Sequence, residues 1–68
     1  MRYAVVIERA GENYSAYVPD LPGCVAIGDS LAEAKSQIAR AMKQHLDGLK
    51  EDGHQAPEPA SVVAYIDA

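Results

Sequence analysis

Tyr17-Val-Pro-Asp-Leu-Pro-Gly-Cys-Val-Ala-Ile-Gly-Asp-Ser30 is the stretch of sequence that decides the fold. Within it, Pro22-Gly23 fits the two central positions of a type II turn, where glycine takes a positive φ without strain. The apolar residues 24–27 that follow predict a short strand. Ser30 and Glu33 form a capping box, in which the hydroxyl accepts from the Glu33 amide and the carboxylate reaches back to the cap amide. The stretch therefore predicts a strand, a turn, a second strand and the start of a helix.

The residues before this stretch predict a β-hairpin. Residues 3–7 (YAVVI) and 14–18 (YSAYV) are rich in β-branched and aromatic residues, and the turn-forming sequence Ala10-Gly-Glu-Asn13 separates them. A short connection of this kind joins antiparallel strands. Both faces of residues 3–7 are apolar, which predicts an interior strand of the sheet.

The residues after the stretch predict one long helix and a last strand. Apolar side chains recur at steps of three and four from Leu31 to about Glu51, and Gly53 is the expected C-terminal stop. Residues 61–66 (SVVAYI) predict a fourth strand, reached by a right-handed crossover. The predicted fold is α+β, in the order β-β-β-α-β, with a four-stranded sheet of strand order 3-2-1-4 and one helix on one face.

A single helix leaves the other face of the predicted sheet open. Val6, Tyr17 and part of the last strand are expected on that face, and residues 24–27 lack the charges that usually protect an edge strand. The 68 residues form one domain, residues 1–68, and a core of this size rarely supplies more than about 3–5 kcal/mol. Its one cysteine forms no internal disulfide. We therefore expect the chain to associate with itself, as a homodimer or a higher oligomer.

Charge and hydropathy limit the other classes of partner. The formal net charge is −4, and the six Lys and Arg residues are scattered from Arg2 to Lys50. No basic stripe of the kind that binds nucleic acid is formed, so we expect no direct binding of DNA or RNA. A basic protein is the more natural partner, because opposite charge speeds encounter. The longest apolar run has five residues, so the sequence predicts neither a membrane span nor a signal peptide, and we expect a cytoplasmic protein.

The reactive side chains do not form a recognisable catalytic or metal-binding pattern. Cys24 with His45 or His54 would be a nucleophile and base, or part of a zinc site, but no third orienting group and no paired ligand spacing is present. Cys24 is better interpreted as a core residue.

The carboxylates offer one further alternative, a two-metal hydrolase site. It would use Asp20, Asp29, Glu33 and Asp67. Glu33 is better explained by the capping box, and Asp29 by the turn before it. No Gly-rich loop leads to a Lys-Ser or Lys-Thr pair that would bind phosphate. We therefore predict no catalytic residue, no cofactor and no metal.

Several short pieces of the sequence resemble the core signature of the HicB antitoxin family. The matching pieces are Val18-Pro-Asp-Leu-Pro-Gly-Cys24, Gly28-Asp-Ser30 and Glu33-Ala34, and the hairpin with Tyr14 and the Gly53…Pro57-x-Pro59 ending extend the match. The resemblance implies that the following residues are a structural signature of the family: Pro19, Asp20, Leu21, Pro22, Gly23, Cys24, Gly28, Ser30 and Glu33.

The resemblance also implies a function. HicB-like domains have a partial RNase H-like fold and act as type II antitoxins, which cover the active site of a small basic HicA toxin, an mRNA-cleaving ribonuclease with a catalytic histidine. Such a protein needs no catalytic residue of its own. The family's C-terminal DNA-binding domain is not expected here, so this chain is predicted to be the short form. The alternatives are a metal-dependent RNase H-like hydrolase, an orphan oligomeric domain that has lost its toxin, or a small-ligand binder at an oligomer interface.

Overall fold

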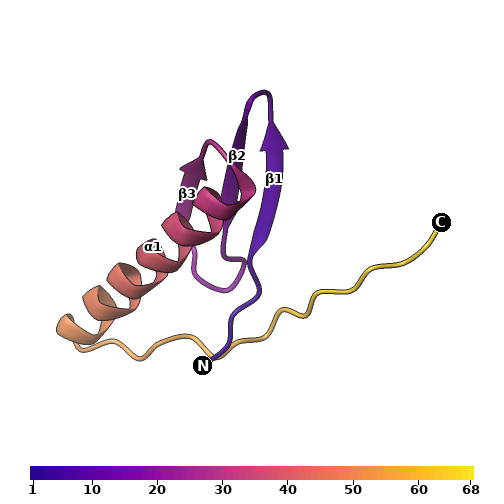
Figure 1. Cartoon of the computed structure of the whole chain (residues 1–68). Helices are drawn as coiled ribbons and strands as arrows, with labels where there is room; N and C mark the ends of the chain where they lie inside the picture. Colours follow the sequence, from indigo (N-terminus) through magenta and orange to yellow (C-terminus); the bar gives the residue numbers. More distant parts are fainter.

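The fold is a three-stranded antiparallel sheet with one helix packed on one face. The computed structural model describes residues 1–68, and Figure 1 shows the elements in chain order. They are β1 (Val6–Ala10), β2 (Asn13–Tyr17), β3 (Val25–Gly28) and α1 (Leu31–Glu51). The strand order is β1-β2-β3, with β2 in the middle. The predicted α+β class and the β-β-β-α order of the first four elements are confirmed.

The hairpin of β1 and β2 is confirmed, with a shift in its first strand. Gly11 has a φ of +64° in the connecting turn, and the register pairs Val6 with Tyr17 and Ala10 with Asn13. β1 therefore begins at Val6, three residues later than predicted. The shift has a physical reason: the amide of Val18 donates to the carbonyl of Cys24 across the following loop, so β2 offers no partner to residues before Val6.

The loop at residues 18–24 is closed by its own backbone hydrogen bonds. The amide of Leu21 donates to Val18 at 3.1 Å, that of Cys24 to Leu21 at 3.1 Å, and that of Val18 to Cys24 at 3.2 Å. Gly23 has a φ of +83°, which matches the third position of the predicted type II turn. We call this segment the 18–24 loop.

Helix α1 begins and ends at the predicted residues. Ser30 is the N-cap, and its Oγ accepts a hydrogen bond from the Glu33 amide at 3.1 Å. The Glu33 carboxylate accepts from the amide of Asp29 at 3.3 Å, one residue before the predicted cap amide. At the other end Gly53 has a φ of +76°, and the amide of His54 donates to the carbonyl of Leu49 at 2.8 Å. A left-handed glycine of this kind is a common helix stop.

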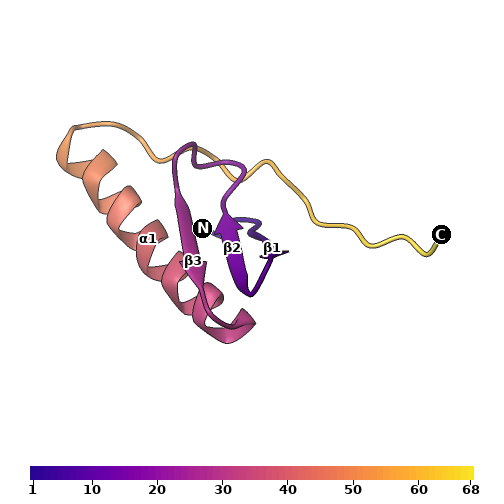
Figure 2. The same ribbon diagram turned by 90° about the horizontal axis from the view of Figure 1, so that it is seen from above.

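The core lies between α1 and the sheet. The helix packs mainly against β3 and β2 and reaches β1 only slightly. Figure 2 shows this arrangement, with α1 beside β3 and β1 on the far side of β2. The buried apolar residues are Ala16, Val18, Leu21, Cys24, Ala34 and Ile38. Half-buried side chains, among them Val5, Ile7 and Met42, extend this core.

The predicted fourth strand is not formed. Residues 61–66 belong to no sheet, so the observed order β1-β2-β3 corrects the order 3-2-1-4, and β1 is an edge strand where an interior one was predicted. Figure 1 shows the reason: after passing the N-terminus, the chain leads away from the free edge of β1. With three strands in the sheet, the RNase H-like assignment stays a prediction.

Candidate protein-binding surfaces

The face of the sheet opposite α1 carries exposed apolar side chains. The register places Val6, Tyr17 and Val25 side by side across the three strands, and Ile27 lies two residues further along β3 on the same face. Val25 and Ile27 are each 65% exposed, and Tyr17 is 40% exposed. We call Val6, Tyr17, Val25 and Ile27 the open sheet face. The prediction that Val6 and Tyr17 lie away from the helix is confirmed.

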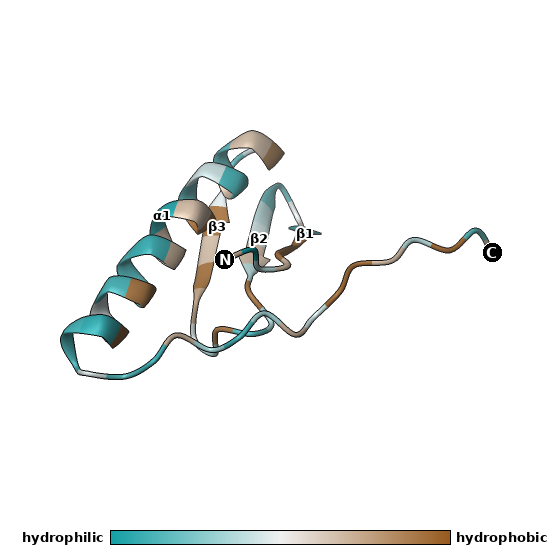
Figure 3. Ribbon diagram, turned by 90° about the horizontal axis from the view of Figure 1, so that it is seen from below, coloured by the Kyte–Doolittle hydropathy of each residue, from teal (hydrophilic) through white to brown (hydrophobic).

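A second apolar surface lies on residues 61–66, which we call the 61–66 segment. Val62, Tyr65 and Ile66 are 89%, 95% and 89% exposed. Figure 3 shows the hydrophobic stretches of this extended chain standing free of the sheet and helix. A contiguous apolar stretch that is this exposed is typical of a binding surface.

Asp20 fixes the place where the 61–66 segment leaves the domain. One carboxylate oxygen, Oδ2, accepts hydrogen bonds from the amides of Ala60 and Ser61 at 2.9 Å each. The other, Oδ1, accepts from the Ser61 hydroxyl at 2.9 Å. Nearby, the Tyr3 hydroxyl donates to the carbonyl of Pro57. These contacts tie the chain beyond α1 to the 18–24 loop and to the N-terminal residues.

We expect the Asp20 contact to weaken at acidic pH. The backbone hydrogen bonds from Ser61 and Ala60, together with the Ser61 hydroxyl, lower the pKa of the Asp20 carboxyl below its ordinary value. The charged form is the one that the native contact favours, so the contact persists above the ordinary carboxyl pKa and is lost as the pH falls through the lowered value. Amide hydrogen exchange at Ala60 and Ser61 is expected to accelerate in Asp20→Asn at neutral pH.

A matched control for that measurement is Asp67→Asn. It removes the same charge from a carboxylate for which the structure shows no hydrogen bond, and exchange at Ala60 and Ser61 should stay as in the parent chain. Equal exchange rates in the parent and in Asp20→Asn would contradict the contact.

The nine signature residues lie in the 18–24 loop and at the junction of β3 with α1. Leu21 and Cys24 are buried, and the remaining residues of the loop turn the chain around them. Gly28 is also buried, because the backbone of Ala34 crosses directly above it: a Cβ built on Gly28 would lie 2.4 Å from the Ala34 amide nitrogen. Ser30 and Glu33 cap the helix. The sequence indicated neither the contact of Asp20 with Ser61 nor the close approach at Gly28.

The side chains of the hypothetical metal, hydrolase and cysteine sites are not assembled into a site. No group of three or more His, Cys, Asp or Glu side chains lies close enough to hold a metal ion. Two of the carboxylates of the two-metal hypothesis have other partners, since Asp20 binds Ser61 and Glu33 binds the Asp29 amide. Cys24 is buried in the core, and this burial raises the pKa of its thiol, which opposes formation of a nucleophilic thiolate.

α1 has 21 residues, but it is too polar to cross a bilayer.

The chain has relatives of known sequence that differ in length. An uncharacterized 14.9 kDa protein from the rep-hol intergenic region of Haemophilus phage HP1 is 36% identical over 66 residues, which cover 97% of this chain and 50% of that protein. This chain thus spans about half the length of the phage relative. UPF0150 protein Ta0767 of Thermoplasma acidophilum is 33% identical over 58 residues, 84% of each chain. A UPF0150 protein of Helicobacter pylori is 43% identical over 47 residues, 69% of this chain and 65% of that one.

A solved structure and a family model agree with each other. A chain of a HicA3 and HicB3 toxin-antitoxin complex superposes with a TM-score of 0.74 at 27% identity, over 88% of this chain and 70% of that chain. A family model described as the HicB_like antitoxin of bacterial toxin-antitoxin system matches residues 3–68. Because this match covers nearly all of the chain whose loop, helix cap and exposed apolar surfaces are described above, the protein belongs to the HicB-like antitoxin family.

Proposed function

We propose that residues 1–68 act as a single HicB-like domain that binds and neutralises a small basic HicA-type toxin in the cytoplasm. The observation that carries this proposal is the match of residues 3–68 to the HicB-like antitoxin family. The likeness to a chain from a HicA3 and HicB3 complex supports a protein partner of the same kind. Neutralisation consists in covering the toxin's active site and requires no catalytic group in this chain.

The open sheet face is the surface that we assign to the toxin. Val25 and Ile27 are largely exposed there, on the face opposite α1. Glu8 pairs in register with Ser15 of β2, which pairs with Ile27, so a carboxylate borders the apolar residues. The net charge of −4 favours the approach of a basic partner. An apolar centre with an acidic border suits binding of a small basic protein.

The test first looks for a small basic protein encoded beside this chain and then measures whether this chain inhibits its cleavage of RNA. That protein alone is expected to cleave mRNA. An excess of this chain is expected to stop the cleavage, and the two proteins are expected to co-purify. Undiminished cleavage in the presence of excess chain would refute the proposed function.

A surface variant tests which face binds the toxin. Val25→Asp places a charge on the open sheet face and is expected to weaken inhibition at least about 30-fold, as for a central interface residue. Gln44→Glu adds the same charge on the exposed side of α1 and should inhibit like the parent chain. If Val25→Asp inhibits the toxin as strongly as the parent chain does, the toxin binds a different face of the domain. Circular dichroism checks that both variants are folded.

We also propose that the domain works as a homo-oligomer. The total exposed area is 5313 Å², whereas a folded 7.3 kDa monomer exposes about 4,200 Å². The radius of gyration of 13.0 Å likewise exceeds the value of about 11 Å for a compact chain of this length. The excess surface supports association of the chain with a second copy.

A further inference from the structure

Two neighbouring parts of the chain have unpaired backbone. β1 pairs with β2 on one side only, and residues 2–5 before it belong to no strand. The 61–66 segment makes no backbone hydrogen bond beyond the Ser61 amide held by Asp20. An unpaired edge strand next to an unpaired apolar segment exposes two sets of hydrogen-bonding groups that are complementary to each other.

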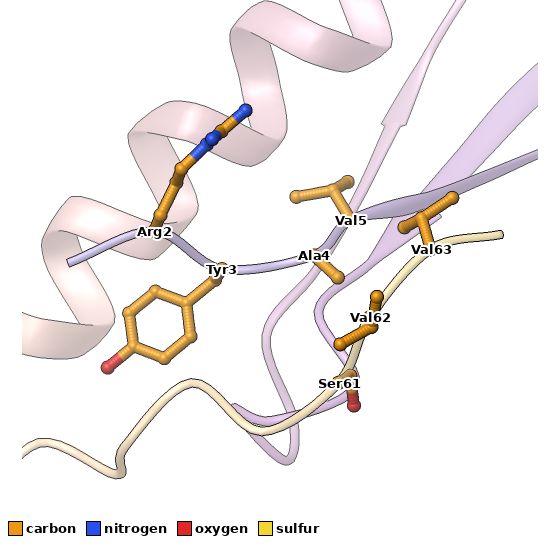
Figure 4. Close-up of a pocket in the computed structure, with 7 residues that line it drawn as sticks. All are labelled: Arg2, Tyr3, Ala4, Val5, Ser61, Val62 and Val63. Carbon is orange, nitrogen blue, oxygen red and sulfur yellow. The ribbon is translucent and has the colours of Figure 1, made fainter.

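Two hollows lie beside residues 2–7, which comprise the approach to β1 and its first residues. A cavity of about 540 Å³ lies between residues 2–5 and residues 61–63, and Figure 4 shows the Ala4 side chain directed toward Val62, whereas the Val5 side chain points to the other side of the chain. An apolar groove of about 240 Å³ lies between Val5 and Ile7 on one side and Ile38 and Met42 of α1 on the other. The groove exists because α1 leans over β3 and β2 and leaves the β1 side of the sheet thinly covered.

A strand added at the edge of β1 would cover these hollows. Its side chains would alternate between the groove under α1 and the opposite side of the sheet. Residues 62–66 are Val-Val-Ala-Tyr-Ile, so both alternating sets are apolar, and none carries a charge. The composition of this segment therefore fits a strand added at the β1 edge. If the segment stays exposed, it is prone to aggregation.

The geometry points to a partner chain as the source of that strand. Asp20 holds Ser61 at the end of the sheet, and from there the segment leads outward, away from its own β1. Val62, Tyr65 and Ile66 are at least 89% exposed, so they meet almost nothing in their own chain. A fixed hinge followed by an outward apolar strand is the arrangement of an exchanged element, in which two copies each donate the segment to the other.

We propose that the 61–66 segment of one copy adds as a fourth strand to the β1 edge of a second copy, and reciprocally, to form a two-fold dimer. The area supports this: each chain exposes about 1,100 Å² more than a compact monomer, and a stable interface buries about 800 Å² per partner. This inference rests on the proposed self-association and names its interface. It is independent of the toxin, which we assign to the open sheet face.

The first test measures the mass of the chain alone by light scattering at micromolar concentration. The parent is expected at the mass of two 7.3 kDa chains. Ile66→Asp is expected to raise the dissociation constant of the dimer at least about 30-fold, because it buries a charge at the new strand. Gln44→Glu adds the same charge on the exposed side of α1 and should leave the dimer as in the parent.

Each other outcome contradicts a defined part of the proposal. A monomeric parent rejects self-association and the exchanged strand together. A dimer that Ile66→Asp leaves unchanged rejects the exchanged strand alone. The parent could also be monomeric alone and show slowed amide exchange at Ile66 only when the basic toxin is added. That result would assign the segment to the toxin and would also reject the exchange. Inhibition of RNA cleavage is measured separately, so failure of the antitoxin function is distinguished from failure of the dimer.

A second test asks whether the contact lies between chains. Ala4→Cys and Val63→Cys are made in separate chains and mixed, because in one chain the two thiols would lie on opposite walls of the same 540 Å³ cavity and would close within that chain. Native Cys24 is buried and not available for this reaction. Oxidation at low concentration is expected to give covalent dimers. Absence of a covalent dimer that joins one chain of each variant would contradict exchange between chains.

Discussion

Replacement of Gly28 by alanine is expected to unfold most of the protein. The added Cβ would lie 2.4 Å from the amide nitrogen of Ala34 and 2.8 Å from its Cα, and these are backbone atoms of the first turn of α1. Ser30 and Glu33 fix that turn through the cap, so the helix cannot move away without losing those hydrogen bonds. We expect a loss of about 3 kcal/mol or more, which is close to the whole stability of a core of this size. Urea denaturation followed by circular dichroism measures it.

The matched control is the same substitution at Gly48. No atom lies within 4 Å of a Cβ built there, and the residue is inside α1, where alanine is preferred to glycine by about 1 kcal/mol. Gly48→Ala is therefore expected to stabilise the protein, so one substitution should have opposite signs at two positions. A Gly28→Ala protein as stable as the parent would show that β3 and α1 are further apart than described.

Replacement of Leu21 by alanine is the second change with a large expected effect. Leu21 has 0% exposure and lies in the core cluster with Ala16, Val18, Cys24 and Ile38. Truncation removes the side chain around which the 18–24 loop closes and leaves a cavity, and such changes cost about 2–5 kcal/mol. Thermal and urea unfolding should both shift strongly to less stable values. Because Asp20 precedes Leu21, loosening of the loop should also speed amide exchange at Ser61.

Leu31→Ala provides the comparison for Leu21. Leu31 is the first residue of α1 and is 52% exposed, so the same truncation removes far less buried surface. We expect a loss of about 1 kcal/mol or less. If the two variants lost equal stability, the 18–24 loop would contribute no more to the core than a surface position does.

The parts of the fold that sequence predicts well are those that local chemistry decides. A positive φ at Gly23, the cap at Ser30 and the stop at Gly53 each follow from the residue type and its immediate neighbours. For the same reason both ends of α1 were predicted at the observed residues. The side of the sheet on which Val6 and Tyr17 lie followed from the alternation along the strands.

The parts that were predicted wrongly depend on contacts between distant residues. The start of β1 is set by the partner that β2 provides, and the Val18 amide is already bonded to Cys24. The sequence of residues 61–66 has strand composition, but composition does not say which chain supplies the partner. Asp20 contacts residues 40 and 41 positions away, which no local pattern indicates. The close approach of Gly28 to Ala34 was not predicted, because it exists only after the helix has packed on β3.

The Asp20 contact also divides the chain into two units of different stability. One unit is the body from β1 to α1, which holds every buried residue of the chain and is closed by the sheet ladder and the helix. The other is the stretch from His54 onward, for which the hydrogen bonds to Asp20 and Tyr3 are the long-range links to the body. Local opening of the second unit breaks only a few hydrogen bonds and exposes little apolar surface, so it requires much less free energy than global unfolding. Proteolytic cleavage after Gly53 is therefore expected to proceed from a fully folded body, and the strand exchange proposed above would protect the outer stretch from it.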